Sequence, residues 1–277
     1  MNKIIRSLAE EGILAALDQN FTEEMACFGR ALPGAKLHED EELTWFLTGP
    51  SGPNGVLLTD FHTDDSAYIE TRIQETIQHF QHHQLQRFGW TVGPSSYPPD
   101  LANFLEEQGL EHRDTTNCMA LALTQPRPPA TLPPDFQISE VTNEEELLIK
   151  CEIEKLSFNS SEVMAAHYRQ SYINNGFGPH KAWHHYIGWY QNKPVTIAAF
   201  LLHAGIAGIY GVGTLPEARR KGFARAMLQY VLSEIERLGY AVAILSPTDL
   251  SLSLYQQLGF RNFCQLYHYT YFFQDAE

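Results

Sequence analysis

Residues 212–225 decide the fold, and they read Val-Gly-Thr-Leu-Pro-Glu-Ala-Arg-Arg-Lys-Gly-Phe-Ala-Arg. The apolar run that starts at Ile206 predicts a strand ending at Thr214, because Pro216 has no backbone N–H with which to continue a sheet. A helix is expected to begin near Ala224, since apolar residues recur on one helical face after it. The stretch therefore predicts a strand, a basic turn and a helix in direct succession.

The turn has the properties of an anion site. The first N–H groups of a helix are unpaired and carry partial positive charge. Arg219, Arg220, Lys221 and Arg225 add fixed positive charge at the same place, and Gly222 lets the backbone approach a ligand closely. A solvated basic helix start is the alternative. Four basic residues within seven positions of a chain with a net charge of −14 favour a cradle for a pyrophosphate.

A second candidate site surrounds Tyr255. Residues 250–258 predict a short helix that ends at Gly259, with Leu254 and Leu258 packed inward. Tyr255 would then lie near the place where the preceding apolar strand, residues 241–245, stops. The alternative is an ordinary core tyrosine whose hydroxyl group reaches the surface.

Together the two sites resemble the GNAT superfamily of acyl-CoA-dependent N-acyltransferases. The family signature, Gln/Arg-x-x-Gly-x-Gly/Ala, is matched by residues 219–224 and follows a strand ending Val-x-Thr-x-Pro at residues 212–216. A Tyr-x-x-Leu-Gly-Phe element follows at residues 255–260. The resemblance covers the chain from about Phe136 onward, and the whole chain looks like a tandem GNAT protein. Within this part, residues 144–158 predict a helix, and the polar, glycine-interrupted stretch that follows is expected to be irregular up to about Lys181.

The resemblance implies an α/β (α+β) fold of two tandem GNAT-like domains, each a mixed, mostly antiparallel central sheet flanked by helices. We expect a degenerate GNAT-like domain over residues 1–124 and a catalytic domain over residues 136–277. A linker is expected at residues 125–135, where five prolines prevent helix and sheet. Residues 105–110 align with residues 255–260, which supports an internal duplication.

The first domain is expected not to bind coenzyme A in this way. Its predicted helix, from Ser66 to Arg87, has an apolar face of Ile69, Ile73, Ile77 and Phe80. It follows Phe-His-Thr-Asp-Asp, which contains no glycine and no basic cluster. The two carboxylates, Asp64 and Asp65, would repel a pyrophosphate. Leu105 stands where the later domain has Tyr255.

The resemblance also implies roles for residues. The backbone groups of Val212, Gly213 and Thr214 would hold the pantetheine arm and the acyl carbonyl. The pyrophosphate would lie on Arg219, Arg220, Lys221, Gly222, Phe223, Ala224 and Arg225. Tyr255 would donate a proton to the departing thiolate. The implied activity is transfer of an acetyl group from acetyl-CoA, as cosubstrate, to a primary amine of a small molecule or peptide. The alternative is a non-catalytic acyl-CoA sensor or a protein-interaction module.

Two positions depart from the family pattern. Thr248 stands where many members have an asparagine seven residues before the tyrosine, and residues 241–245 contain no titratable residue. The general base is therefore open among His203, Glu154 and a chain of waters.

Composition limits the other functions. The chain has 19 basic and 33 acidic residues, so it is expected not to bind nucleic acid and to favour cationic acceptors such as a polyamine, an aminoglycoside or a basic peptide terminus. Four isolated cysteines indicate no metal site, and the spacing of His79 and His83 is typical of a solvated helix face. We expect a cytoplasmic protein with no membrane span or signal segment. A homodimer is left open.

Overall fold

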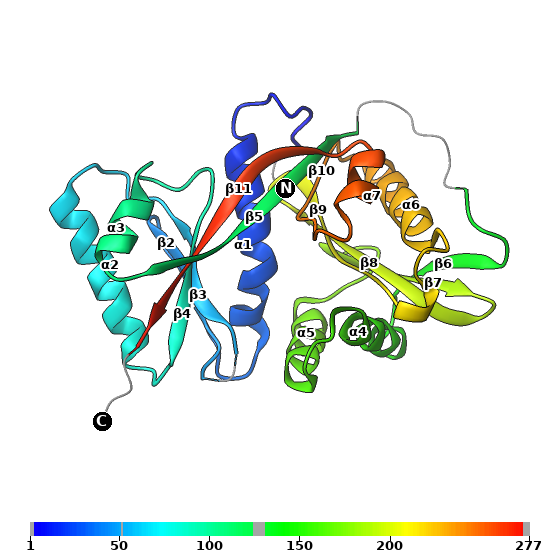
Figure 1. The fold of residues 1–277 in the computed structure, drawn as a ribbon, viewed down its shortest axis with the longest axis horizontal. Helices are drawn as coiled ribbons and strands as arrows, with labels where there is room; N and C mark the ends of the chain where they lie inside the picture. The colour runs from blue at the N-terminus through cyan, green and yellow to red at the C-terminus, as the bar shows by residue number, and fades with distance from the viewer. Residues whose placement is uncertain (1–2, 51, 124–130, 274–277) are drawn as a thin grey trace. The chain divides into compact units, whose positions relative to one another are not determined.

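The structure, a computed structural model, describes residues 3–50, 52–123 and 131–273. The chain forms two compact units, and neither is continuous in sequence. The first unit comprises Met1–Asn20 and Cys118–Phe263, and the second comprises Phe21–Asn117 and Cys264–Glu277. Figure 1 traces the elements along the chain.

The elements of the first unit alone are β6 (Phe136–Glu140), α4 (Glu144–Phe158), α5 (Glu162–Asn175), β7 (Trp183–Tyr190), β8 (Lys193–His203), β9 (Ile206–Thr214), η1 (Pro216–Ala218), α6 (Phe223–Arg237), β10 (Val242–Leu245) and α7 (Leu252–Gln257). Those of the second alone are β1 (Lys36–Glu39), β2 (Leu43–Leu47), β3 (Asn54–Thr59), α2 (Ser66–Gln81), β4 (Arg87–Val92) and α3 (Leu101–Glu107). Three elements have residues in both units: α1 (Ile13–Ala31), β5 (Glu111–Ala122) and β11 (Arg261–Phe272).

The sheet of the first unit has the strand order β5-β10-β9-β8-β7-β6. Only β9 and β10 pair in parallel, and the other neighbours are antiparallel. Side chains alternate between the two faces of each strand, so Tyr186 packs with α6 while Ile187 packs with α4. Helices α6 and α7 therefore cover one face of this sheet, and α4 and α5 cover the other (Figure 1).

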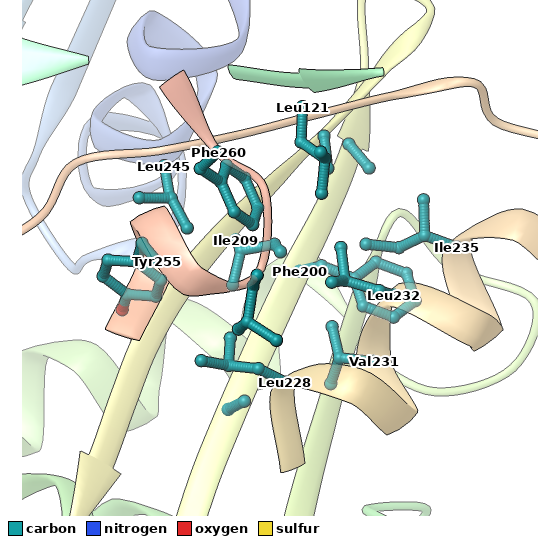
Figure 2. Close-up of a cluster of buried hydrophobic side chains, with 14 of the residues drawn as sticks. Leu121, Phe200, Ile209, Leu228, Val231, Leu232, Ile235, Leu245, Tyr255 and Phe260 are labelled. Carbon is teal, nitrogen blue, oxygen red and sulfur yellow. The ribbon is translucent and has the colours of Figure 1, made fainter. Parts of the chain in front are cut away.

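The core under α6 and α7 is apolar apart from the phenol groups of Tyr186 and Tyr255. The stripe predicted on α6 is buried against β8 and β9, and Figure 2 shows it meeting Phe200 and Ile209. Leu245 of β10 and Phe260 complete the same cluster. Burial of such side chains stabilises the fold by about 1.5–3 kcal/mol each, and here it fixes both helices on the sheet that carries the site.

The second unit repeats part of this arrangement in the order β1-β2-β3-β4-β11. Its strands β3 and β4 pair in parallel and are connected by helix α2. Strands β9 and β10 likewise pair in parallel and are connected by α6. The predicted apolar face of α2 is buried, and Phe80 stacks on Phe88 with ring centroids 4.3 Å apart. The indole N–H of Trp90 donates to Thr59 Oγ1 at 2.9 Å.

Strand exchange explains why the units are discontinuous. Residues 119–122 of β5 pair antiparallel with β10 in the first unit. Residues 267–272 of β11 pair antiparallel with β4 in the second. The units therefore differ from the expected division at residues 124 and 136, because a sheet gains its last strand from the other half of the chain. Within the expected linker, residues 125–130 lie outside the described residues.

Most elements expected in the later segment are confirmed. Residues 144–158 and 206–214 form the predicted helix and strand with the predicted bounds. The helix expected from Ser66 to Arg87 ends earlier, at Gln81. Helix α5 lies in a region expected to be irregular up to Lys181. It buries only Ser171 and Tyr172, so its sequence shows no apolar stripe.

A fragment of residues 136–277 tests the exchange. It lacks β5 and β4, so β10 and β11 would each lose an antiparallel partner. We expect the fragment not to melt cooperatively under conditions where the full chain does, because an unpaired edge leaves backbone groups unsatisfied and invites association. Circular dichroism melting with size-exclusion chromatography measures this. A monomeric fragment that melts like the full chain would contradict the prediction.

Candidate active site

The candidate site begins where β9 and β10 separate. Strand β10 pairs with β9 only at Ala207 and Gly208, although β9 continues to Thr214. The other edge of β9 stays paired with β8 as far as Thr214. In the described part of the chain, no strand covers the β10-facing edge of residues 209–214.

Backbone donors and acceptors line this open edge. The N–H of Leu215 donates to Val195 O at 3.0 Å, toward β8, and Gly213 O accepts from Thr196 Oγ1 at 2.7 Å on the same side. Because backbone groups alternate along a strand, those of Val212 and Thr214 face the opposite edge. That edge can therefore pair with an extended ligand that carries amide groups.

A bulge shapes β9 beside this edge. The register with β8 shifts between Ile197 and Ala199, opposite Gly211, whose φ is +56°. A Cβ atom on Gly211 would lie 2.7 Å from Glu154 Oε1. Both the backbone conformation and the close approach of α4 therefore require glycine here. The bulge changes the direction of β9 next to the place where β9 and β10 separate.

Helix α6 starts with its amides uncovered. Its N-cap, Gly222, is left-handed at φ +86° and provides no side-chain cap. Among the described residues, none accepts a hydrogen bond from the N–H groups of residues 223–225. A Cβ atom on Gly222 would have nothing within 4 Å. The dipole and free donors of this helix start therefore face open space, as an anion site requires.

Helix α2 of the second unit starts differently. The Asp65 carboxylate accepts hydrogen bonds from the N–H groups of Ala67 and Tyr68, at 3.1 and 3.3 Å. The protein's own negative charge thus occupies the place where an anion would bind. The start of α2 is therefore capped by the protein itself. That the first domain does not bind coenzyme A in the same way stays a prediction.

The predicted basic residues divide into two pairs. Arg219 donates to Thr214 O at 3.0 Å and to Ser157 O at 3.1 Å, so its guanidinium group ties β9 to the end of α4. Arg225 donates to the side chain of Gln257. Arg220 and Lys221 are exposed and have no hydrogen-bond or ion-pair partner among the described residues. Those two side chains are available to an anion in front of α6.

Tyr255 is buried in the apolar cluster under α6 and α7. Its side chain packs against Phe260, and Figure 2 shows the phenol oxygen on the side of the ring away from Phe260. Burial raises the pKa of Tyr255 to about 12, against a smaller lowering by the Ser251 hydroxyl. The phenol is therefore protonated at neutral pH and can act as a proton donor. Thr248 begins this turn, since its carbonyl accepts from the N–H groups of Ser251 and Leu252.

An ion pair on α4 lies on the other side of β9. Lys150 Nζ is 2.7 Å from Glu154 Oε2, and the lysine side chain is fully buried. The hydroxyl group of Tyr172, on α5, donates to Glu154 Oε1 at 3.4 Å, and Lys150 Nζ lies 4.2 Å from the centroid of the Tyr172 ring. From the sequence, Glu154 is only one of three candidates for the general base. A Lys–Glu pair four residues apart is usually exposed, so nothing in it indicated burial.

Two histidines lie near this region with different surroundings. His185 of β7 is fully buried beside Tyr172, and in the described residues neither of its ring nitrogens has a hydrogen-bond partner. Burial, with the charge of Lys150, holds the pKa of His185 well below its usual value, so the ring is neutral. His203, the other candidate base, pairs with Ile206 at the far end of β9. It is separated from Gly211 by about 17 Å of strand at roughly 3.3 Å per residue.

Comparisons with known proteins identify this arrangement. Residues 203–263 match the family model described as an acetyltransferase (GNAT) domain. A tandem GNAT protein from the clavulanic acid biosynthesis pathway has a TM-score of 0.68 at 13% identity, over 99% of both chains. A GCN5-related N-acetyltransferase from Kribbella flavida has a TM-score of 0.67 at 17% identity, over 94% of this chain and 96% of that one. The chain has the GNAT fold.

The GNAT fold agrees with the expected fold class, two tandem domains with mixed, mostly antiparallel sheets flanked by helices. A GCN5-related N-acetyltransferase from Sphaerobacter thermophilus is also similar, with a TM-score of 0.64 at 17% identity over 88% of this chain and 77% of that one. No curated protein matches the sequence. This fold supports acyl transfer in general.

Two further observations concern the described residues. They contain no group of three or more His, Cys, Asp or Glu side chains placed to hold a metal ion. None of their helices combines the length and apolar character needed to cross a membrane.

The ring of His79 packs against the ring of Trp45, with centroids 4.5 Å apart, and the ring centroids of His79 and His83 are 4.9 Å apart.

Arg219→Ala tests whether the guanidinium group ties β9 to α4. Loss of two hydrogen bonds should lower the free energy of unfolding by about 1–2 kcal/mol, because the carbonyl groups of Thr214 and Ser157 lose a shared donor. Urea denaturation measures the change. Lys221→Ala is the matched control and should stay within about 0.5 kcal/mol. Equal stability of Arg219→Ala and the wild type would contradict the assignment.

Proposed function

We propose that this protein is an N-acetyltransferase that transfers an acetyl group from acetyl-CoA to a primary amine. The observation that carries the proposal is the uncapped start of α6 beside the open edge of β9. The helix start is suited to a pyrophosphate, and the strand edge is suited to the amides of an extended arm. Coenzyme A contains both groups.

The residues present fit the coenzyme in a definite order. The N–H groups of residues 223–225, with Arg220 and Lys221, would hold the pyrophosphate. The backbone groups of Val212 and Thr214 would pair with the pantetheine amides. Because β9 runs toward this helix start, the thioester end would lie back along the strand, near Gly211. Arg219 would support this site through the backbone of Thr214, and Arg225 through Gln257.

The proposed reaction is direct attack of a neutral amine on the acyl carbon. Backbone N–H groups on the open edge of β9 would stabilise the negative oxygen that develops there. Tyr255 would donate its proton to the sulfur as the C–S bond breaks. Its pKa of about 12 keeps the donor form present at and above neutral pH, and that form is lost only as the pH approaches 12.

A second candidate is an acyl-CoA sensor without turnover. It is favoured by one observation, the wholly apolar and buried β10, which offers no titratable group to the gap. The two candidates share a binding site and differ in chemistry. Binding and turnover therefore have to be measured separately.

Gly222→Asp and Gly222→Asn form a matched pair for the binding site. Aspartate and asparagine have the same size and both tolerate a left-handed backbone, so the pair isolates charge at the start of α6. We expect the aspartate variant to bind acetyl-CoA about tenfold more weakly than the asparagine variant, roughly 1.4 kcal/mol. Isothermal titration calorimetry measures both. Equal affinities would place the pyrophosphate elsewhere, and no binding by the wild-type protein at millimolar ligand would end the proposal.

Tyr255→Phe separates the enzyme from the sensor. The variant keeps the buried ring and removes the proton donor, so kcat should fall by about 10²–10⁴-fold while acetyl-CoA affinity changes little. Thiol release with spermidine, kanamycin and a lysine-containing peptide as acceptors measures turnover. A wild-type protein that binds acetyl-CoA but turns over none of the amines is a sensor. An unchanged kcat in the variant would remove Tyr255 from the mechanism.

A further inference from the structure

Helix α4 packs unusually close to β9, and it does so at the bulge. Cβ atoms on Gly211 and Gly213 would lie 2.7 Å from Glu154 Oε1 and 2.9 Å from Ser157 Cβ. Both glycines are therefore needed for one turn of α4 to approach the strand. The closest approach places a carboxylate oxygen directly against the backbone of the bulge.

The two oxygens of Glu154 have different surroundings. Oε2 is held by the buried ammonium group of Lys150 at 2.7 Å. Among the residues that the structure describes, Oε1 accepts only one long hydrogen bond, of 3.4 Å, from the hydroxyl group of Tyr172. A carboxylate oxygen can accept two hydrogen bonds, so Oε1 keeps capacity for a further donor. The Glu154 side chain is 12% exposed, whereas that of Lys150 is fully buried. The accessible part of the pair is the acid.

The surroundings of the pair leave a hydrogen-bond acceptor at Oε1 for a further donor. A buried ion pair is stable only when its remaining acceptors are satisfied. The titratable groups around Glu154 are Lys150 and Cys151 on α4, Tyr172 on α5 and His185 on β7, and the charge of Arg169 on α5 also acts on Cys151. His185 is neutral and the pKa of Cys151 is raised to about 11 by burial, so Lys150 is the cation that pairs with Glu154 among the described residues. A second N–H donor can therefore be accommodated at Oε1.

We propose that Glu154 is the general base of the acetyl transfer, and that Oε1 receives the proton of a cationic primary amine. This assignment rests on the proposed function, which places the acyl carbon near Gly211. It adds the group that recognises the acceptor and accepts its proton. Lys150 acts as a positioning residue, because its ammonium group fixes Oε2 and so orients Oε1 toward the bulge.

The ammonium group first gives one proton to Glu154 Oε1, and the neutral nitrogen that results forms a bond to the acyl carbon. The electron pair of the C–S bond goes to sulfur, which takes the Tyr255 proton. The second nitrogen proton passes through solvent to the Tyr255 phenolate, and Glu154 releases its proton to solvent, so both residues are restored. One ammonium ion and one thioester become one amide, one thiol and one proton.

Glu154→Gln is the decisive variant, and Glu152→Gln is its matched control on the same helix. Glu152 is exposed and pairs only with Lys155 in the described structure. Two acceptors are compared at pH 7.5: spermidine, whose amines are protonated, and hydroxylamine, which is largely neutral. Glu154→Gln should lose about 100-fold or more in kcat/KM with spermidine but less than about threefold with hydroxylamine, which arrives without the extra proton. Glu152→Gln should match the wild type with both.

A second variant separates loss of catalysis from loss of folding. Glu154→Gln leaves the Lys150 ammonium group buried without its carboxylate, which is destabilising. Lys150→Met combined with Glu154→Gln removes both charges at similar volume, and circular dichroism with acetyl-CoA titration verifies the fold and the coenzyme site. The double variant should show the same loss with spermidine and the same retention with hydroxylamine.

The outcomes separate the two proposals. Wild-type kcat/KM with spermidine in a folded Glu154→Gln or double variant overturns the assignment of the base and indicates a water chain. Equal losses with both acceptors also overturn it, since they indicate structural damage. Turnover of hydroxylamine but not spermidine by the wild-type protein overturns the base while retaining the acyltransferase. No turnover of either acceptor overturns the proposed function and this assignment together.

Discussion

The loss of pairing between β9 and β10 after Gly208 is the constraint on which the site depends. A sheet that stayed paired would use the backbone groups of Val212 and Thr214 internally and leave none for a ligand. The separation is held open from both faces. The α6–α7 core fixes the strands on one side, and the glycine contacts with α4 fix β9 on the other. Arg219 also connects the end of β9 to the end of α4, because it donates hydrogen bonds to Thr214 O and Ser157 O.

Local patterns predicted the elements of the site but not its acidic side. The strand of residues 206–214 and the basic turn after it could be predicted because Pro216, Gly222 and the apolar stripe each act within a few residues. The sequence could not show that Lys150 and Glu154 are buried. That depends on Gly211, which is 57 residues after Glu154 and admits the helix only in the folded sheet. The partners of β5 and β11 were missed for the same reason, since strand pairing between distant segments leaves no local signal.

Two copies of one strand–helix–strand connection thus have opposite electrostatics. In the second unit Asp65 neutralises the start of α2, and Leu105 fills the position that corresponds to Tyr255. In the first unit the start of α6 is uncapped, and the phenol of Tyr255 is present. The two copies therefore differ in a few residues at the helix start and on the following helix. The sheets themselves are built in the same way.

The exchange of β5 and β11 has a consequence for biosynthesis. The chain leaves the ribosome from its N-terminus. One edge of β4 therefore stays unpaired until residues 267–272 of β11 have been made. An exposed strand edge is a site of wrong association in a growing chain. The sheet of the second unit is completed only after β11 has been made, so the nascent protein depends on long-range pairing that chaperones can protect.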